Sequence, residues 1–469
     1  MKKSASSSTS MPAPAPAVAM AGVALSRQLR AVAQAWQGIG QGRSGTAVLE
    51  LVPAALRPGV QALLFQALRQ RGLAQALARQ LAPRKPAPAV DALLCVALAL
   101  CADPEQPLYE PFTLVNQTVE AAKQEASTRA QAGFLNACLR RFLRESATLL
   151  AQVQHDEQAR WNHPPWWVQR LRQDHPTQWQ AILQANGQQA PMVLRVNVQK
   201  TTVAAYLQAL EVAGIAASPV GEVGLVLQRA VPVQQLPGFE QGWVSVQDAA
   251  AQLAAPLLLA GLDVSQPLRV LDACAAPGGK TAHLLEYAGA QSPLKVTALE
   301  IDPQRAQRIG GTLARLGVQA QAQVVVADAS RPQDWWQQHC AGALFDAILL
   351  DAPCTASGIV RRHPDVPWLR RESDIAQLAH IQARLLDTLW PLLQPGGRLL
   401  YCTCSVFKAE GAGQVQAFLA RHSDACHWPS PGHLLPGIAP VGANLQNNQD
   451  HTAGEHDGFF YALLQKASV

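Results

Sequence analysis

The spacing of apolar and polar residues along the first third of the chain predicts helices. From about Ser26 to Leu150, apolar residues recur every three to four positions, which is the period of an amphipathic helix. The proline-rich segment 84–88 predicts a break between two helices. The apolar run 92–102 is too short to cross a bilayer and predicts a buried helix. We therefore expect an all-α region here.

The pattern changes between about Trp161 and Gly242. Segment 191–197 has the composition of a strand, and a helix and further short strands are expected after it. These elements predict a small α+β module. Tryptophans gather near its start, where they either fill the core or offer surfaces on which bases stack. They are Trp161, Trp166, Trp167 and Trp179.

From Trp243 onward, strand-like and helical segments alternate. The expected strands are 268–272, 296–300, 323–327, 347–350 and 398–402. Alternation of this kind predicts an α/β doubly wound, Rossmann-like domain with a parallel sheet, in which ligands bind beyond the carboxyl ends of the strands. Residues 429–457 are rich in Pro, Gly, Asn and His, and they predict a long loop before a final strand at 459–464.

Length and composition support a division into several domains. The 469 residues exceed one ordinary domain, and 49% apolar residues suffice for packed cores. The net charge of +5 is compatible with a nucleic-acid partner without demonstrating one. We expect a disordered tail at 1–20, a helical domain at 21–155, the α+β module at 156–242 and the α/β domain at 243–469.

The cysteine content favours a reducing compartment. The chain has nine cysteines, and an odd number in a long chain argues against a disulfide framework and for the cytoplasm. Lys2 and Lys3 resemble the start of a targeting signal, but Pro12, Pro14 and Pro16 interrupt any apolar helix there. A disordered tail is therefore preferred over a cleaved signal, and no membrane segment is expected.

A glycine-rich turn, Cys274–Lys280, follows the first strand of the α/β region and opens a helix at about Thr281. Gly278 and Gly279 allow a ligand to approach the backbone, and the helix N-terminus offers N–H groups. A P-loop would need glycine where Cys274 stands, and the dinucleotide pattern G-x-G-x-x-G is absent. A nucleoside without phosphates, such as S-adenosylmethionine (SAM), fits this turn better than a pyrophosphate.

Acidic residues follow the next two expected strands. Glu300 stands where an acid usually accepts hydrogen bonds from ribose hydroxyls. Asp302 is instead expected to cap the following helix, which begins with Pro303. Asp328 ends the third strand, where it would face the adenine end of a nucleoside.

Two loops at strand ends carry cysteines that could act as nucleophiles. Cys354 follows Asp351 at the end of the fourth strand, and Cys404 follows the fifth. Methylation of carbon 5 of a pyrimidine needs a thiolate that adds to carbon 6. Either cysteine can provide it, with Lys280 expected to lower the thiol pKa and Asp351 to hydrogen-bond or protonate N3 of the base. Cys402 and Cys404 form a C-x-C pair without a matching Cys/His pair nearby, so no metal is expected.

Two basic segments are candidates for contact with RNA. The first, residues 361–371, contains Arg361, Arg362, Arg370 and Arg371 with an aromatic residue among them. The second is one face of a predicted helix that bears Arg140, Arg141 and Arg144. Each is either a solvated charged surface or a surface that contacts the RNA backbone.

The motifs together resemble those of the bacterial RsmB (Sun/Fmu) family of 16S ribosomal RNA cytosine-C5 methyltransferases. They are LDACAAPGGKT at 271–281, LDAPC at 350–354, IVRRHPD at 359–365, YCTCS at 401–405 and DGFF at 457–460. The helical N-terminal region, with Asn136 and the sequence LRRF at 139–142, is similar to the NusB-like RNA-binding domain of this family.

The resemblance implies SAM as cofactor and a set of residues that contact it. These are Cys274, Ala275, Ala276, Pro277, Gly278, Gly279, Lys280, Glu300, Asp328 and Asp351. It also implies that Cys404 is the nucleophile and that Cys354 assists release of the product. Asp351 and Lys280 complete the expected catalytic set. Glu300 stands where an aspartate is common, and Cys402 replaces a residue that is usually small.

The expected function is methylation of one cytosine in 16S rRNA, either naked or in an early assembly intermediate, by a monomer in the cytoplasm. Another RNA, such as tRNA, is an alternative substrate. A nicotinamide-dependent oxidoreductase is a rival, although the dinucleotide pattern is missing. A non-catalytic RNA-binding or antitermination protein is a second rival, although it would have no need of both Cys354 and Cys404.

Overall fold

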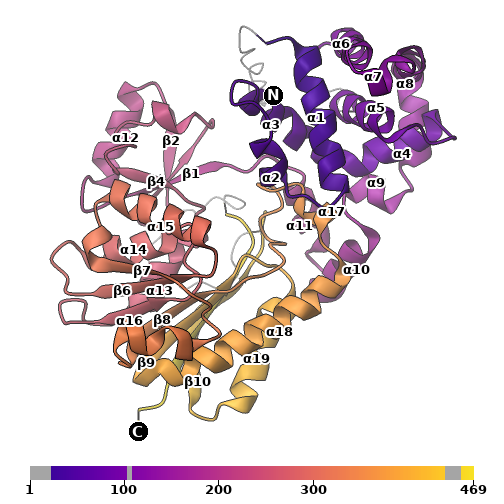
Figure 1. Ribbon diagram of the computed structural model, residues 1–469. Coiled ribbons are helices and arrows are strands. Elements are labelled where there is room, and N and C mark those ends of the chain that lie inside the picture. The colour runs from indigo at the N-terminus through magenta and orange to yellow at the C-terminus, as the bar shows by residue number, and fades with distance from the viewer. Residues whose placement is uncertain (1–22, 103–107, 439–455, 469) are drawn as a thin grey trace, which may run out of the picture. The chain divides into compact units, whose positions relative to one another are not determined.

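The computed structural model describes residues 23–102, 108–438 and 456–468 (Figure 1). The predicted disordered tail at 1–20 lies outside the described residues. The chain forms two compact units, of which the first ends at Asn162 and the second begins at His163.

The first unit is all-helical, as predicted. Its helices are α1 (Leu25–Gly40), α2 (Gly45–Glu50), α3 (Arg57–Leu68), α4 (Arg71–Leu81), α5 (Pro88–Cys101), α6 (Pro111–Lys123), α7 (Ala126–Arg129), α8 (Ala132–Val153) and α9 (Glu157–Trp161). The apolar helix α5 is buried along most of its length and contacts α1, α3, α4, α6 and α8. It is the predicted core helix, and the predicted break at 84–88 lies between α4 and α5. Within the described residues, no helix is both long and apolar enough to span a bilayer.

The second unit begins with the predicted α+β module. Helices α10 (Pro165–Asp174) and α11 (Trp179–Asn186) precede an antiparallel sheet of order β2-β3-β1-β4. The strands are β1 (Met192–Val196), β2 (Ala217–Val220), β3 (Gly224–Leu227) and β4 (Val244–Val246), and α12 (Val203–Val212) follows β1. Tyr206 and Leu210 of α12 pack with Leu194 and Leu225 of the sheet. Of the tryptophans near the start, Trp167 is fully buried and packs edge-on against Phe407, so it belongs to the core.

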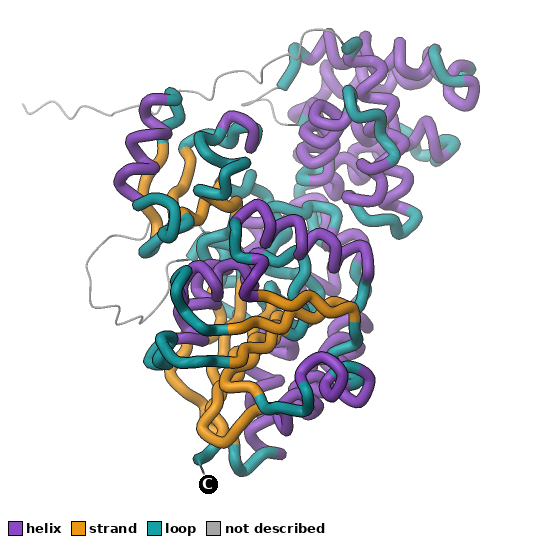
Figure 2. The backbone as a smooth tube through the Cα atoms, turned by 60° about the vertical axis from the view of Figure 1, so that its left-hand side comes forward, coloured by secondary structure: helices purple, strands orange, loops and turns teal. Residues whose placement is uncertain are grey.

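A seven-stranded sheet of order β10-β11-β9-β8-β5-β6-β7 forms the rest of the second unit (Figure 2). Its strands are β5 (Arg269–Asp272), β6 (Lys295–Glu300), β7 (Ala322–Val326), β8 (Phe345–Asp351), β9 (Leu393–Thr403), β10 (Ala425–Leu434) and β11 (Phe459–Lys466). The five strands from β9 to β7 in this order are parallel, which confirms the predicted doubly wound core. The sheet as a whole is mixed, because β11 pairs antiparallel with both β9 and β10.

Helices cover both faces of this sheet. Alternate strand residues point to opposite sides, and apolar residues lie on both sides, so each face must be buried. On one face Val270, Ala298 and Leu349 pack against α13 (Ala254–Leu259), α14 (Gly279–Ala288) and α15 (Pro303–Leu316). On the other face Leu271, Leu299 and Leu350 pack against α16 (Trp336–Cys340), α18 (Glu372–Leu389) and α19 (Ala412–Arg421). A short helix, α17 (Val366–Leu369), lies between β8 and α18.

The prediction of a loop at 429–457 is wrong for residues 429–434. Residues up to Leu434 continue strand β10, which pairs with β11 across an irregularity between Trp428 and Gly432. Proline and glycine lower strand propensity, but backbone pairing with an existing strand overrides that local preference. Residues 439–455 of the predicted loop lie outside the described residues.

Candidate active site

Two adjacent parallel strands bring the two candidate cysteines together. Strand β8 pairs with β9 so that Asp351 lies opposite Cys402, and the loops that follow leave the sheet side by side. The Sγ atoms of Cys354 and Cys404 are 3.4 Å apart. The backbone N–H of Gly358 donates to the carbonyl of Cys404 at 2.9 Å, which connects the two loops. The topology therefore places both thiols at one point beyond the strand ends.

The expected lowering of the thiol pKa near Lys280 is wrong for Cys354. The hydrogen bond between the thiols of Cys354 and Cys404, together with burial, raises the pKa of Cys354 well above its usual value. Burial, followed by the charge of Asp351, likewise raises the pKa of Cys402. Cys354 and Cys402 therefore keep their protons at neutral pH.

Lys280 is engaged by a carboxylate. Its Nζ donates to Asp351 Oδ2 at 2.6 Å, and the other oxygen of Asp351 accepts a 3.5 Å hydrogen bond from the Cys402 thiol. Burial alone would lower the pKa of Lys280, but the charge of Asp351 and the hydrogen bond to it raise this pKa above its usual value. Lys280 is therefore a permanent cation that orients Asp351.

The glycine turn has the geometry that the sequence predicts. Gly278 has φ of 95° and precedes α14, which begins at Gly279. A Cβ at Gly278 would lie 3.1 Å from Cα of Ile309 and would be strained, so only glycine suits the turn. The rest of the predicted segment, from Cys274 to Pro277, connects β5 to this helix. Burial and three nearby carboxylates raise the pKa of Cys274, which makes it a poor nucleophile.

Asp272, at the end of β5, also belongs to this site, although it is not among the predicted site residues. Its carboxylate is fully buried and accepts a 2.6 Å hydrogen bond from the hydroxyl of Thr281 in the first turn of α14. Burial raises the pKa of Asp272 to about 7. The burial of Asp272 could not be predicted from its position in a strand, because that burial depends on the helix that packs over it.

The acids after β6 and β7 divide into different roles. Asp302 caps α15 by accepting from the backbone N–H of Gln304 and Arg305, as predicted. Glu300 is buried and accepts hydrogen bonds from the backbone N–H of Asp302 and, at 3.4 Å, from Arg305. Asp328 accepts hydrogen bonds from the backbone and the hydroxyl of Ser330. Glu300 ends β6 and Asp328 follows β7, at the same edge of the sheet as the glycine turn.

The polar groups at this edge of the sheet suit a nucleoside such as SAM. The start of α14 provides backbone N–H groups beside the turn, and Glu300, Asp328 and Asp351 supply acceptors for hydroxyl and ammonium groups. In the ranges that the structure covers, no group of three or more His, Cys, Asp or Glu side chains could hold a metal ion.

Arg361 and Arg362 of the first basic segment are ion-paired inside the second unit. Arg361 is buried and donates to Asp457, which lies just before β11. Arg362 donates to the same Asp457 and, at 2.8 Å, to Asp248. These two residues thus fasten the loop after β8 to the C-terminal strand, a role that neither sequence interpretation includes.

The other two arginines of this segment, Arg370 and Arg371, lie in different surroundings. Arg370 donates to the carbonyls of Thr355 and Cys354 at 3.0 and 3.3 Å, and so supports the cysteine loop. Arg371 is exposed. Contact between Arg371 and an RNA backbone stays a prediction.

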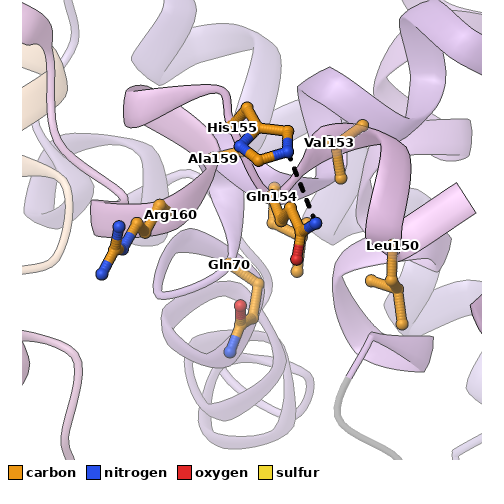
Figure 3. Close-up of a pocket in the computed structure, with 8 residues that line it drawn as sticks. Gln70, Leu150, Val153, Gln154, His155, Ala159 and Arg160 are labelled. Carbon is orange, nitrogen blue, oxygen red and sulfur yellow. Dashed lines mark hydrogen bonds between the residues drawn. The ribbon is translucent and has the colours of Figure 1, made fainter.

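The basic face of α8 is exposed, and contact with RNA stays a prediction there too. Arg141 donates to Glu145 at 2.9 Å, and Arg140 donates to Asn136 at 3.1 Å. The first unit also contains a cavity of about 580 Å³ whose lining comes from α4, α8, α9 and adjoining residues (Figure 3). Its lining includes Gln70, Gln154 and Arg160 and none of the predicted site residues.

Comparisons with known proteins point to one family of methyltransferases. Residues 260–465 match the protein-family model described as 16S rRNA methyltransferase RsmB/F, and residues 163–234 match the ferredoxin-like domain of RsmF/B-like methyltransferases. The chain is 45% identical to ribosomal RNA small subunit methyltransferase B of Vibrio cholerae, over 75% of this chain and 76% of that protein. The protein of the same name from Pseudomonas syringae pv. tomato is 42% identical, over 86% of this chain and 90% of that protein.

A solved structure shares the fold. The methyltransferase homolog protein from Pyrococcus horikoshii is 26% identical and superimposes with a TM-score of 0.53, covering 66% of this chain and 98% of that one.

Proposed function

Because the chain belongs to the RsmB/F family of 16S rRNA methyltransferases, we propose that it transfers a methyl group from SAM to carbon 5 of one cytosine in 16S rRNA. It is a SAM-dependent RNA methyltransferase. The observation that carries the choice of carbon 5 is the pair of thiols, 3.4 Å apart, at the ends of adjacent strands. Transfer to a nitrogen or an oxygen would need no thiol, whereas carbon 5 becomes nucleophilic only after a thiolate adds to carbon 6.

We assign the addition to Cys404. Its sulfur contributes an electron pair to the new bond with carbon 6, and the resulting enamine places electron density on carbon 5. SAM, when bound, supplies the methyl group for that carbon. A base then takes the proton of carbon 5, the electron pair of that C–H bond re-forms the double bond between carbons 5 and 6, and the bond between carbon 6 and sulfur breaks with its electron pair returning to Cys404. The raised pKa of Cys354 supports this division, because a thiol that keeps its proton is the poorer attacking group.

Cys354, Lys280 and Asp351 complete the proposed catalytic set. Cys354 is close enough to Cys404 to act on the same nucleotide, and we assign it to release of the methylated product. Asp351 is partly exposed and held by Lys280, and we assign it to hydrogen-bond with or protonate N3 of the cytosine, or to contact SAM. The residues from Cys274 to Gly279, together with Glu300 and Asp328, are assigned to SAM.

The substrate side of the proposal follows from access to the base. The thiols can reach carbon 6 only in a base that has left its stack, so we propose naked 16S rRNA or an early assembly intermediate rather than paired RNA. We also propose a monomer that acts in the cytoplasm. The helical domain at 21–155 and the module at 156–242 are assigned to RNA binding, and residues 243–469 to catalysis.

The test is transfer of labelled methyl from SAM to protein-free 16S rRNA, to 30S particles and to tRNA, with the modified base identified by mass spectrometry. One 5-methylcytosine in 16S rRNA supports the proposal. Label that appears only in tRNA would move the substrate to another RNA. SAM binding without transfer to any RNA would favour the non-catalytic alternative, and binding of a nicotinamide dinucleotide in place of SAM would favour the oxidoreductase.

A further inference from the structure

A buried carboxylate that the reaction above does not use lies behind the two thiols. Glu410 ends the short 3-10 helix Lys408–Glu410, between β9 and α19, and its side chain is fully buried. Carboxylates are rarely buried to this degree unless their oxygens are hydrogen-bonded. Burial raises the pKa of Glu410, and hydrogen bonds from Ser405 and Thr355 oppose that shift.

The hydrogen bonds of Glu410 reach the residues that follow each cysteine. Its Oε1 accepts from the backbone N–H of Thr355 at 2.9 Å, and its Oε2 accepts from the hydroxyl of Thr355 at 2.5 Å. The same Oε2 accepts from the hydroxyl of Ser405 at 2.6 Å. Thr355 directly follows Cys354, and Ser405 directly follows Cys404. One carboxylate therefore holds both loops, one residue away from each thiol.

Further hydrogen bonds fix the carboxylate in its place. Gln382 of α18 donates to Glu410 at 3.3 Å and to the carbonyl of Pro353 at 2.9 Å. The Ser405 hydroxyl also pairs with the Ser357 hydroxyl at 2.8 Å. Thr355, Ser357 and Ser405 are all fully buried. Water therefore has little access to replace these bonds if the carboxylate is lost.

We propose that Glu410 is a positioning residue that sets the separation between Cys354 and Cys404. The inference rests on the function proposed above, in which the two thiols act in turn on one nucleotide. Glu410 bonds to the neighbours of the cysteines and not to their sulfur atoms, so it acts through the loops. Its loss lets the two loops separate, and the thiols no longer address the same nucleotide together.

The first test compares Glu410→Ala with Glu410→Gln. Glutamine has the same size and keeps one acceptor oxygen, and the two hydroxyls can rotate to accept from its amide. Because a misplacement of about 1 Å can lower a rate on the order of 100-fold, we expect Glu410→Ala to lower kcat by roughly that factor. The Kd for SAM and the KM for RNA should change little, and Glu410→Gln should recover most of the rate. Glu211→Ala, which changes an exposed glutamate on α12, is the matched control.

The second test measures the thiol separation without methyl transfer. Diamide oxidises two nearby thiols to a disulfide, and the two electrons and two protons reduce its N=N bond to a hydrazine. The rate at which the disulfide between Cys354 and Cys404 forms, followed by tandem mass spectrometry of the peptides, reports how often the thiols meet. Glu410→Ala should slow this rate at least tenfold, and Glu410→Gln and Glu211→Ala should leave it near that of the unchanged protein.

The two tests separate this inference from the proposed function. If the unchanged protein methylates no RNA but Glu410→Ala slows disulfide formation, the positioning role stands and the function fails. Normal kcat and normal disulfide formation in a folded Glu410→Ala protein would overturn the positioning role. Equal losses of kcat, SAM affinity and Tm would also overturn it, because Glu410 would then serve folding alone. If Glu410→Ala does not fold, Ser405→Ala, which removes one hydrogen bond to the carboxylate, takes its place in both tests.

Discussion

Lys280 donates a 2.6 Å hydrogen bond to Asp351, and this bond joins the first turn of α14 to the end of β8. The glycine turn assigned to SAM and the loop that carries Cys354 are thereby connected by one ion pair. The side chains of Lys280 and Asp351 are only 13% and 28% exposed. Solvent therefore weakens this ion pair less than it weakens a fully exposed pair. The pair therefore links the cofactor side of the site to the base side.

Replacement of Lys280 by methionine is expected to weaken SAM binding. The change leaves Asp351 without its cationic partner, and a hydrogen bond to a charged group is worth about 1.5–3 kcal/mol, which corresponds to roughly 10-fold to 100-fold in affinity. Isothermal titration calorimetry with SAM measures the effect. Lys295→Met, at an exposed position at the start of β6, is the control. An unchanged Kd in Lys280→Met would show that the ion pair does not order the SAM site.

The two cysteine variants should fail at different steps. Cys404→Ala should abolish methyl transfer while SAM binding survives, because no other group is assigned to add to carbon 6. Cys354→Ala should accumulate a covalent protein–RNA adduct that resists denaturation, visible as a shifted band on a denaturing gel. Cys426→Ala, which removes an exposed thiol on β10, should behave like the unchanged protein. Ordinary turnover by Cys404→Ala would show that Cys404 is not the nucleophile. A covalent RNA adduct in that variant would show that the roles of Cys404 and Cys354 are reversed.

The buried acid Asp272 should make stability fall as pH rises. Its folded-state pKa is raised to about 7 from 3.8, so between these values the unfolded chain loses the proton while the folded protein keeps it. The contribution of Asp272 to the free energy of unfolding is therefore most favourable below the unfolded-state pKa. It falls by roughly 4 kcal/mol as the pH rises to about 7. Asp272→Asn removes the ionisation and keeps an acceptor for the Thr281 hydroxyl.

The measurement is the difference in unfolding free energy between Asp272→Asn and the unchanged protein, taken from urea unfolding at pH 4.5 and at pH 7.5. The difference should shift in favour of Asp272→Asn at the higher pH. Parallel stability curves for the two proteins across this range would contradict the raised pKa.

Loss of the Arg362 ion pairs should destabilise the second unit. Arg362→Met leaves Asp248 and Asp457, both mostly buried, near each other without this guanidinium. Removal of one partner from a buried ion pair typically costs about 3–5 kcal/mol. Differential scanning calorimetry should show a lower Tm, and Arg371→Met, at an exposed position beside the same loop, should not. An unchanged Tm with a raised KM for RNA would instead restore the interpretation that Arg362 contacts the RNA backbone.

Local signals explain why much of the fold and site could be predicted. The strands β5 to β8, the second half of β9 and β11 are largely apolar segments, and the turn at Gly278 needs a residue that tolerates positive φ, so both are visible in short stretches of sequence. Cys354 and Cys404 could be placed at strand ends for the same reason. The motif around them also identified the family, which the comparisons confirm.

What the sequence alone determined is therefore the order of the elements, the family and the residue types at the strand ends. The tertiary structure decided which of these residues meet. The 3.4 Å separation of the thiols depends on the register of β8 with β9, and the burial of Asp272 depends on the packing of α14. Arg361 and Arg362 pair with Asp457, about 100 positions away, and Glu410 accepts hydrogen bonds from Thr355, about 50 positions away. Strand β10 forms because β11 offers it a backbone to pair with. These outcomes depend on long-range contacts, burial and desolvation, which no local pattern of residues contains.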